Sequence, residues 1–216
     1  TNVTTLRSSF PGTQWYLAVI GTQTAVAYVD VQDSNAGEGN TIAGGTGTVN
    51  SGRNVNWTFS AAVTCSSNVA SGVWSASGSW TGCPGLTPGP GDVVQINSGH
   101  TITLDVSATI AALTFAGGTT AGVLTHSGTN SLTVTTTATN GVTINQPTAA
   151  AVNAWNINTG SATVSGLISL PGIDATTTFV AKIVTTTGTL NANGGITFAG
   201  TTPLTKVIDM AGGAGR

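Results

Sequence analysis

The stretch Leu113-Thr114-Phe115-Ala116-Gly117 returns almost unchanged as Ile196-Thr197-Phe198-Ala199-Gly200. Related triplets of an apolar, a polar and an apolar residue occur at Val142-Thr143-Ile144, Ile168-Ser169-Leu170 and Ile208-Asp209-Met210. The first four copies follow one another at nearly even intervals, and the fifth comes after less than half such an interval. Such triplets are typical of strands with one buried face, and a period of roughly 20 to 50 residues is typical of a solenoid. The repeat therefore predicts an all-β chain with a β-solenoid over residues 91–216.

Three short strands with their turns would fill one interval of this repeat, so each interval is expected to be one coil. In that arrangement Ile, Val, Leu and Phe point inward and stack on themselves from coil to coil. Thr and Ser point outward, where β-branched Thr still suits a strand.

The part of the chain before the solenoid divides into two predicted regions. Residues 1–62 read as an N-terminal β module of short strands and turns. Residues 63–90 are rich in Trp, Gly and Pro and read as a connector or cap, because proline cannot lie in a central strand. Trp74 and Trp80 are six positions apart, on one side of an extended segment. We expect this pair to cover an end of the solenoid, where a terminal coil has an unpaired edge.

The composition restricts the classes of partner. Only 6% of the residues are charged, against about 25% in an average soluble domain, and the net charge is −2. A surface with so little repulsion favours association, so we expect copies of the chain to bind one another. Five Lys and Arg are too few for a phosphate-binding stripe, so nucleic acid is not an expected partner. No apolar run is long enough to cross a membrane.

The two cysteines, Cys65 and Cys83, predict a disulfide that closes the connector. Two free thiols are the alternative. A metal site would need more ligands than His100 and Asp92 supply. Low charge together with a disulfide favours an extracellular location.

Two segments resemble parts of the right-handed parallel β-helix of large secreted bacterial surface proteins, which are adhesin-like or exoprotein-like. The segment that resembles the start of such a helix carries Trp80-Thr81-Gly82, Gly91-Asp92-Val93-Val94, Ile96-Asn97-Ser98-Gly99-His100-Thr101 and Leu104-Asp105. The segment that resembles a module at its far end carries Thr5-Leu6-Arg7-Ser8-Ser9, Pro11-Gly12-Thr13-Gln14-Trp15, the run from Tyr28 to Ala36, and the run from Asn54 to Phe59. The resemblance implies a surface or matrix role and brings no catalytic motif.

The order of these segments suggests how subunits join. The segment resembling a helix end comes first, and the sequence stops within a coil. We therefore expect the last coil of one subunit to be completed by the first strands of the next, which would give an open filament. The predicted junction consists of Thr1, Asn2, Val3, Thr4, Thr5, Leu6, Leu204, Val207, Ile208 and Met210. The same break would arise if this sequence were one repeat of a longer chain.

Each of the other candidate sites also has a simpler structural interpretation. The oxygen-bearing residues Asp30, Asp33, Asn35 and Glu38 are a calcium candidate, or an ordinary turn. The aromatic residues Trp15, Trp74 and Trp80 are candidates for stacking on carbohydrate, or part of the core. The sequons at Asn2 and Asn56 are candidate glycosylation sites.

The sequence predicts no enzyme and, calcium apart, no cofactor. His100 would need an acid such as Asp92 or Asp105 beside it to act as a base, and His126 has no evident partner. The acids are not clustered as glycosidases need. The predicted function is that of an extracellular structural protein, a head-to-tail filament subunit that is pilus-like or part of a fibrous adhesin. The alternative is a carbohydrate-binding adhesin module of a large repetitive surface protein.

Overall fold

The computed structural model describes residues 3–24, 26–45, 47–59, 63–83, 86–137, 140–172, 179–198 and 206–210. The described fold consists of strands and one short 3-10 helix, η1 (Ser77–Ser79). The chain forms two compact units. The first contains Thr1–Val63 and Gly89–Gly91, and the second contains Thr64–Pro88 and Asp92–Arg216.

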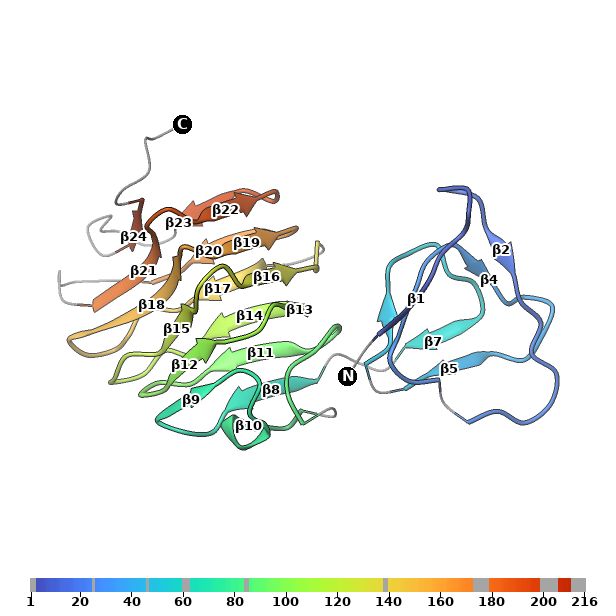
Figure 1. The fold of residues 1–216 in the computed structure, drawn as a ribbon, viewed down its shortest axis with the longest axis horizontal. Helices are drawn as coiled ribbons and strands as arrows, with labels where there is room; N and C mark the ends of the chain where they lie inside the picture. The colour runs from blue at the N-terminus through green and yellow to red at the C-terminus, as the bar shows by residue number, and fades with distance from the viewer. Residues whose placement is uncertain are drawn as a thin grey trace. The chain divides into compact units, whose positions relative to one another are not determined.

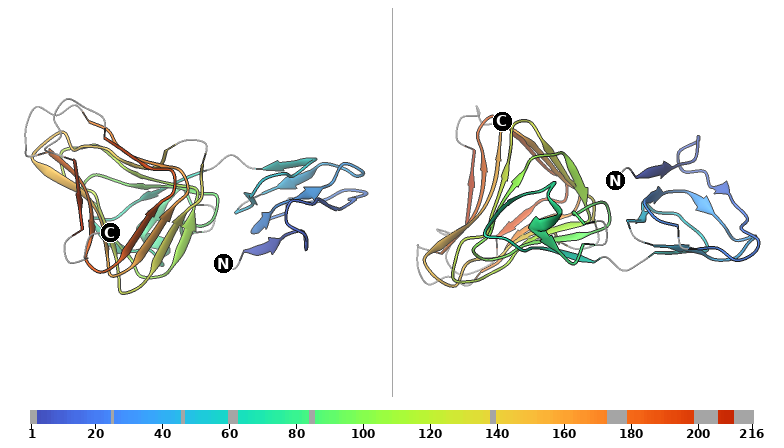
Figure 2. Two further views of the ribbon diagram at one scale, coloured as in Figure 1. Left: turned by 90° about the horizontal axis from the view of Figure 1, so that it is seen from above. Right: turned by 60° about the horizontal axis from the view of Figure 1, so that its bottom comes forward.

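The second unit is a β-solenoid with three walls (Figures 1 and 2). The first sheet contains, in spatial order, β10 (Trp80–Thr81), β8 (Thr64–Ser67), β11 (Val93–Ile96), β14 (Ala112–Phe115), β17 (Asn140–Ile144), β20 (Leu167–Leu170) and β23 (Ile196–Phe198). The second sheet contains β9 (Ser71–Val73), β12 (Thr101–Leu104), β15 (Val123–His126), β18 (Ala151–Asn158), β21 (Phe179–Thr185) and β24 (Lys206–Asp209). The third contains β13 (Ala108–Ile110), β16 (Ser131–Val134), β19 (Ser161–Val164) and β22 (Thr189–Ala192).

The strands of neighbouring coils pair in parallel, and the pairing follows the sequence repeat. Leu113 is opposite Val142, Val142 is opposite Ile168, and Ile168 is opposite Ile196. The first four copies of the repeat therefore occupy one position in four successive coils, and the predicted solenoid is confirmed. Three of these side chains are completely buried, and Ile196 in the last coil is partly exposed.

The fifth copy of the repeat was assigned wrongly. Ile208 lies in β24 of the second sheet, opposite Ile183, and not in the first sheet. The reason is its spacing, because the short interval from Ile196 to Ile208 covers only part of a turn around the solenoid.

The start of the solenoid also differs from the prediction. Strands β8 and β9 pair in parallel with β11 and β12, so coils begin at Thr64 rather than at residue 91. Most of the region predicted as a connector or cap thus belongs to the first coil, whereas Gly89–Gly91 belong to the first unit. The strands of the first coil read Thr-Cys-Ser-Ser and Ser-Gly-Val, which lack the aliphatic alternation of later coils because other groups fill the interior there.

The first unit is built from smaller coils of the same kind. One sheet has the order β1 (Thr4–Leu6), β3 (Val29–Val31) and β6 (Val49–Asn50). Two further pairs are β2 (Trp15–Tyr16) with β4 (Ser34–Asn35), and β5 (Ile42–Gly44) with β7 (Trp57–Phe59). Every one of these pairs is parallel, so successive strands wind around a small core that includes Val31, Ala36 and Ile42.

Truncating inner side chains should cost most in the middle of the stack. Leu124 is completely buried, whereas Leu190 in the last coil is partly exposed. We expect Leu124→Ala to lower the free energy of unfolding by about 2 to 5 kcal/mol and Leu190→Ala to lower it clearly less, as measured by urea denaturation. Equal losses would contradict a core that is complete in the middle and uncovered at the last coil.

Candidate functional site

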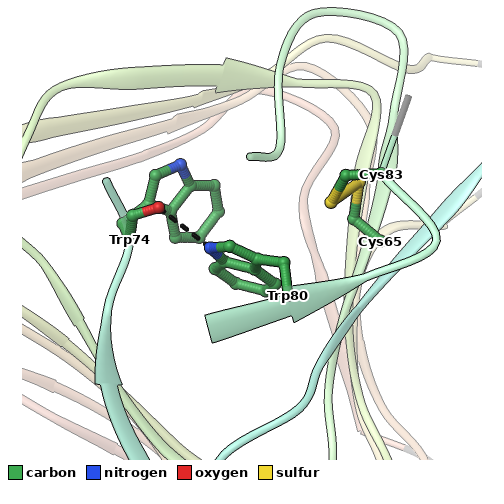
Figure 3. The surroundings of a disulfide bond; sticks show 4 residues. All are labelled: Cys65, Trp74, Trp80 and Cys83. Carbon is green, nitrogen blue, oxygen red and sulfur yellow. Dashed lines mark hydrogen bonds between the residues drawn. A yellow bond between two sulfur atoms is a disulfide. The ribbon is translucent and has the colours of Figure 1, made fainter. Parts of the chain in front are cut away.

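The first coil of the second unit is closed by large side chains. Trp74 and Trp80 are 1% and 6% exposed and meet edge to face with ring centroids 5.0 Å apart. The Trp80 Nε1–H donates to the Trp74 carbonyl at 2.9 Å (Figure 3). Beside them the predicted disulfide is present, joining Cys65 and Cys83 with 4.6 Å between their Cα atoms. The antiparallel strand β10 covers the edge of β8, so the core and the edge of the first sheet are covered here.

The last coil has the opposite character. Phe198 is 52% exposed, although Leu170, at the same position one coil earlier, is 0% exposed. In the described part of the chain, β22, β23 and β24 each have a neighbouring strand on one side only. We call the uncovered side of these three strands the open end. On β22 and β23 it presents the apolar side chains of Leu190 and Phe198 together with a sheet edge that has no neighbouring strand among the described residues.

The backbone of the open end can accept another strand. Thr189 N donates to Gly160 O at 3.0 Å, and Gly195 O accepts from Ile168 N at 3.0 Å. Because alternate residues of a parallel strand direct their backbone groups to opposite neighbours, Leu190 and Phe198 direct theirs outward.

A second uncovered edge lies on β1 of the first unit. Thr4 N donates to Tyr28 O at 2.8 Å, and Leu6 O accepts from Gln32 N at 3.1 Å. By the same alternation Thr5 directs its backbone groups away from β3. Thr4 is exposed and Leu6 partly exposed, whereas their partners Val29 and Val31 are buried. We call the uncovered side of β1 the first edge.

The predicted junction residues therefore lie at two uncovered edges. Val3, Thr4, Thr5 and Leu6 are on or next to β1, and Val207, Ile208 and Met210 are on or directly after β24. Thr1, Asn2 and Leu204 lie outside the described residues.

Carbohydrate stacking is wrong for two of the three tryptophans. Trp74 and Trp80 are buried in the first coil, so neither indole face can meet a sugar ring. Trp15 on β2 is partly exposed and donates through Nε1 to Gln32 O at 3.0 Å. Stacking at Trp15 stays a prediction.

The calcium candidates do not converge on one point. The carboxylate of Asp30 lies 2.6 Å from Arg7, and Asp33 Oδ1 lies 2.9 Å from Arg53 Nε, an ion pair without hydrogen-bond geometry. Asn35 Oδ1 accepts from Gly37 N at 3.0 Å. Among the described residues no group of three or more His, Cys, Asp or Glu side chains could hold a metal. Calcium binding by Asp30, Asp33, Asn35 and Glu38 together stays a prediction.

The glycosylation candidate Asn56 has a structural role. Its Nδ2, the atom that would carry a glycan, donates to Ala36 O at 2.9 Å and to Gly39 O at 3.0 Å. A glycan would disrupt this pair of bonds. Asn2 lies outside the described residues.

The partner of His100 is a serine rather than an acid. His100 Nδ1 lies 2.9 Å from Ser67 Oγ, which also accepts from Asn97 N at 2.8 Å. Ser67 is buried, so a substrate cannot reach its hydroxyl oxygen. Asp105 instead accepts from Ser75 N at 3.0 Å. This arrangement holds the turn and does not form an accessible nucleophile and base.

His126 has a partner that the sequence did not reveal. Its Nε2 accepts from Trp155 Nε1 at 3.0 Å, and its Nδ1–H donates to Asn130 O at 3.1 Å. The ring is 2% exposed, and burial lowers the pKa of His126, although the bond to Asn130 acts against this. The sequence did contain one indication of this contact. His126 and Trp155 are 29 residues apart, which is the length of one coil.

The fold places the chain among β-solenoids. Comparison with protein-family models, curated proteins and solved structures finds no match to this chain. Across the described ranges, no helix has the length and apolar character that a membrane crossing requires.

Acid should destabilise the solenoid through His126. Its pKa in the folded protein is below the usual value near 6.5, so the unfolded chain binds more protons as the pH falls below that value. We expect the free energy of unfolding to decrease from pH 7 to pH 5 in urea titrations. His126→Gln, which does not titrate, should weaken this dependence. The same slope in both proteins would contradict this role.

The disulfide should stabilise the closed end. Its two cysteines are 18 residues apart, and the loop-entropy relation gives about 3 kcal/mol for such a loop. Replacing both cysteines with Ala should therefore lower the melting temperature in calorimetry, and a reducing agent should lower that of the wild type equally. An unchanged melting temperature in both experiments would show that the bond adds no stability.

Proposed function

We propose that this protein is an extracellular structural protein that assembles head to tail, as the subunit of a surface filament or fibrous adhesin. The observation that carries the proposal is the open end. Phe198 is more than half exposed there, while Leu170, at the same position one coil earlier, is completely buried.

Covering the open end would satisfy two physical needs at once. An added coil would remove the apolar side chains of the last coil from water, which contributes about 25 cal/mol for each Å² buried. It would also pair the outward backbone groups of Leu190 and Phe198. Edge strands with such unpaired groups readily bind another strand.

The surface charge supports self-association. Strands β22 and β23 contain no charged residue. Strand β24 carries Lys206, which is buried, and Asp209, whose carboxylate lies 2.9 Å from Lys182. Two copies that approach through this end would meet little electrostatic repulsion.

A disulfide and the resemblance to secreted bacterial surface proteins support an extracellular location. The side chains that first suggested chemistry, among them His100, Asp30 and Asp33, have partners within the fold. A mechanical role, in which stacked coils carry load through backbone hydrogen bonds, fits these observations.

Placing a charge at the open end should prevent assembly. We expect the wild type to form fibres at high protein concentration, seen by negative-stain electron microscopy and by sedimentation. Phe198→Asp should stay monomeric, because an added coil would bury the new carboxylate without a partner. Leu86→Asp is the matched control, since Leu86 is 70% exposed and lies outside the last coil. Wild-type protein that stays monomeric at every concentration would refute the proposed function.

A further inference from the structure

We infer that the partner covering the open end is the first unit of a second copy, with β1 added to the last coil. This inference rests on the proposed function and identifies the surface that receives the open end. In the order of their coils, the first unit is uncovered at its start and the second at its finish, which makes the two surfaces complementary.

The start of the first unit is an uncovered strand edge, and aromatic side chains lie at its finish. At the start, β1 has only β3 beside it, and Thr4 and Leu6 stay accessible. At the finish, Trp57 and Phe59 stack with centroids 5.9 Å apart on β7, next to the buried Ile42 of β5.

Residues 89–91 extend this cover. They belong to the first unit, and a Cβ on Gly91 would lie 3.8 Å from the Val49 side chain of β6. Residues 89–91 therefore lie against the finish of the first unit, and at its start β1 has a neighbouring strand on one side only among the described residues.

The second unit has the reverse arrangement. Its start is closed by β10, the tryptophan pair and the disulfide, and its finish is the open end. Each strand of the solenoid pairs with the preceding coil through the edge that faces that coil, as β23 pairs with β20. A strand added after β23 must pair through this same edge. The first edge is the edge of β1 that would face a preceding coil. Two open ends would instead present identical edges to each other, which pair only as antiparallel strands.

The residues of β1 suit the open end. Thr5 directs its backbone N–H and C=O outward, toward the position of an incoming strand. Thr4 and Leu6 are on the inner side, where they would continue the apolar stack above residues such as Phe198. Strand β1 contains no charge, and the neighbouring Arg7 is held by Asp30 at 2.6 Å, so no unpaired charge would be buried.

Contact between these unlike surfaces repeats from copy to copy. Each added copy covers one open end and brings another, and a filament results where the rotation between copies does not close a ring.

A mixing experiment tests the inference. Thr5→Pro removes the outward N–H of β1 and leaves its bonds to β3, which use Thr4 and Leu6. Phe198→Asp blocks the open end. Each variant alone should be monomeric in size-exclusion chromatography with light scattering, because each retains one functional surface. Mixed in equal amounts, they should form a heterodimer of twice the monomer mass and nothing larger.

Two further variants make the outcome clear. Thr5→Val keeps the backbone N–H and should form fibres like the wild type. Thr4→Asp changes only an exposed side chain on the inner side of β1, so it should fold, stay monomeric, and form the same heterodimer with Phe198→Asp.

Fibres formed by both Thr5→Pro and Thr4→Asp would overturn the inference, and the proposed function would survive if Phe198→Asp remained monomeric. Dimers of Thr5→Pro alone would likewise overturn it, since they indicate contact between two open ends. Mixtures of either β1 variant with Phe198→Asp that stay monomeric would overturn it as well. Failure of the wild type to assemble would instead refute the proposed function itself.

Discussion

A coil of this solenoid cannot bury its own inner face, and the rest of the structure follows from that constraint. Each apolar side chain is covered by the equivalent side chain of the next coil, as Leu113 is by Val142 and Val142 by Ile168. The parallel backbone ladder fixes this register, because a shift of one residue would turn every inner side chain outward. Stability is therefore shared between neighbours, and a coil with one neighbour has an exposed core.

The two ends of the second unit deal with this constraint differently. At the first coil, Trp74 and Trp80 supply within one coil the apolar volume that a neighbour would supply, and β10 pairs the free edge in the antiparallel direction. An antiparallel strand cannot be extended as a further coil, so this end is finished. Nothing comparable covers Phe198 among the described residues, and the parallel direction of β23 continues the coil pattern. The stack is therefore polar, with one end closed to addition and the other open to it.

The sequence predicted what repeats and missed what does not. The triplets ending in Phe115 and Phe198 revealed the coils, because the first-sheet strand of each of these coils keeps its alternation of apolar and polar residues. The coil from Val94 to Leu113 is shorter than the coils that follow it, so the repeat did not reveal it. The first coil was missed because cysteine and tryptophan replace its aliphatic residues. The bond between His126 and Trp155 was missed because nothing in either strand alone marks the other as its neighbour.

Variation in coil length is accommodated at the corner between the first and second sheets, and a buried amide shows how. Asn153 is completely buried. Its Nδ2 donates to Ala116 O at 2.9 Å and Asn145 O at 2.7 Å, and its Oδ1 accepts from Gly122 N. These backbone groups belong to two successive corners that have left the strand ladder, where an unpaired group would cost about 1 to 3 kcal/mol. One side chain thus satisfies both corners, and the walls on either side keep their parallel pairing although the corners differ in length. The ladders themselves shift register between Asn140 and Val142 and between Asn156 and Asn158, and parallel pairing continues past these shifts to β23 and β24. This continuity is the condition for a further coil to add at the last coil.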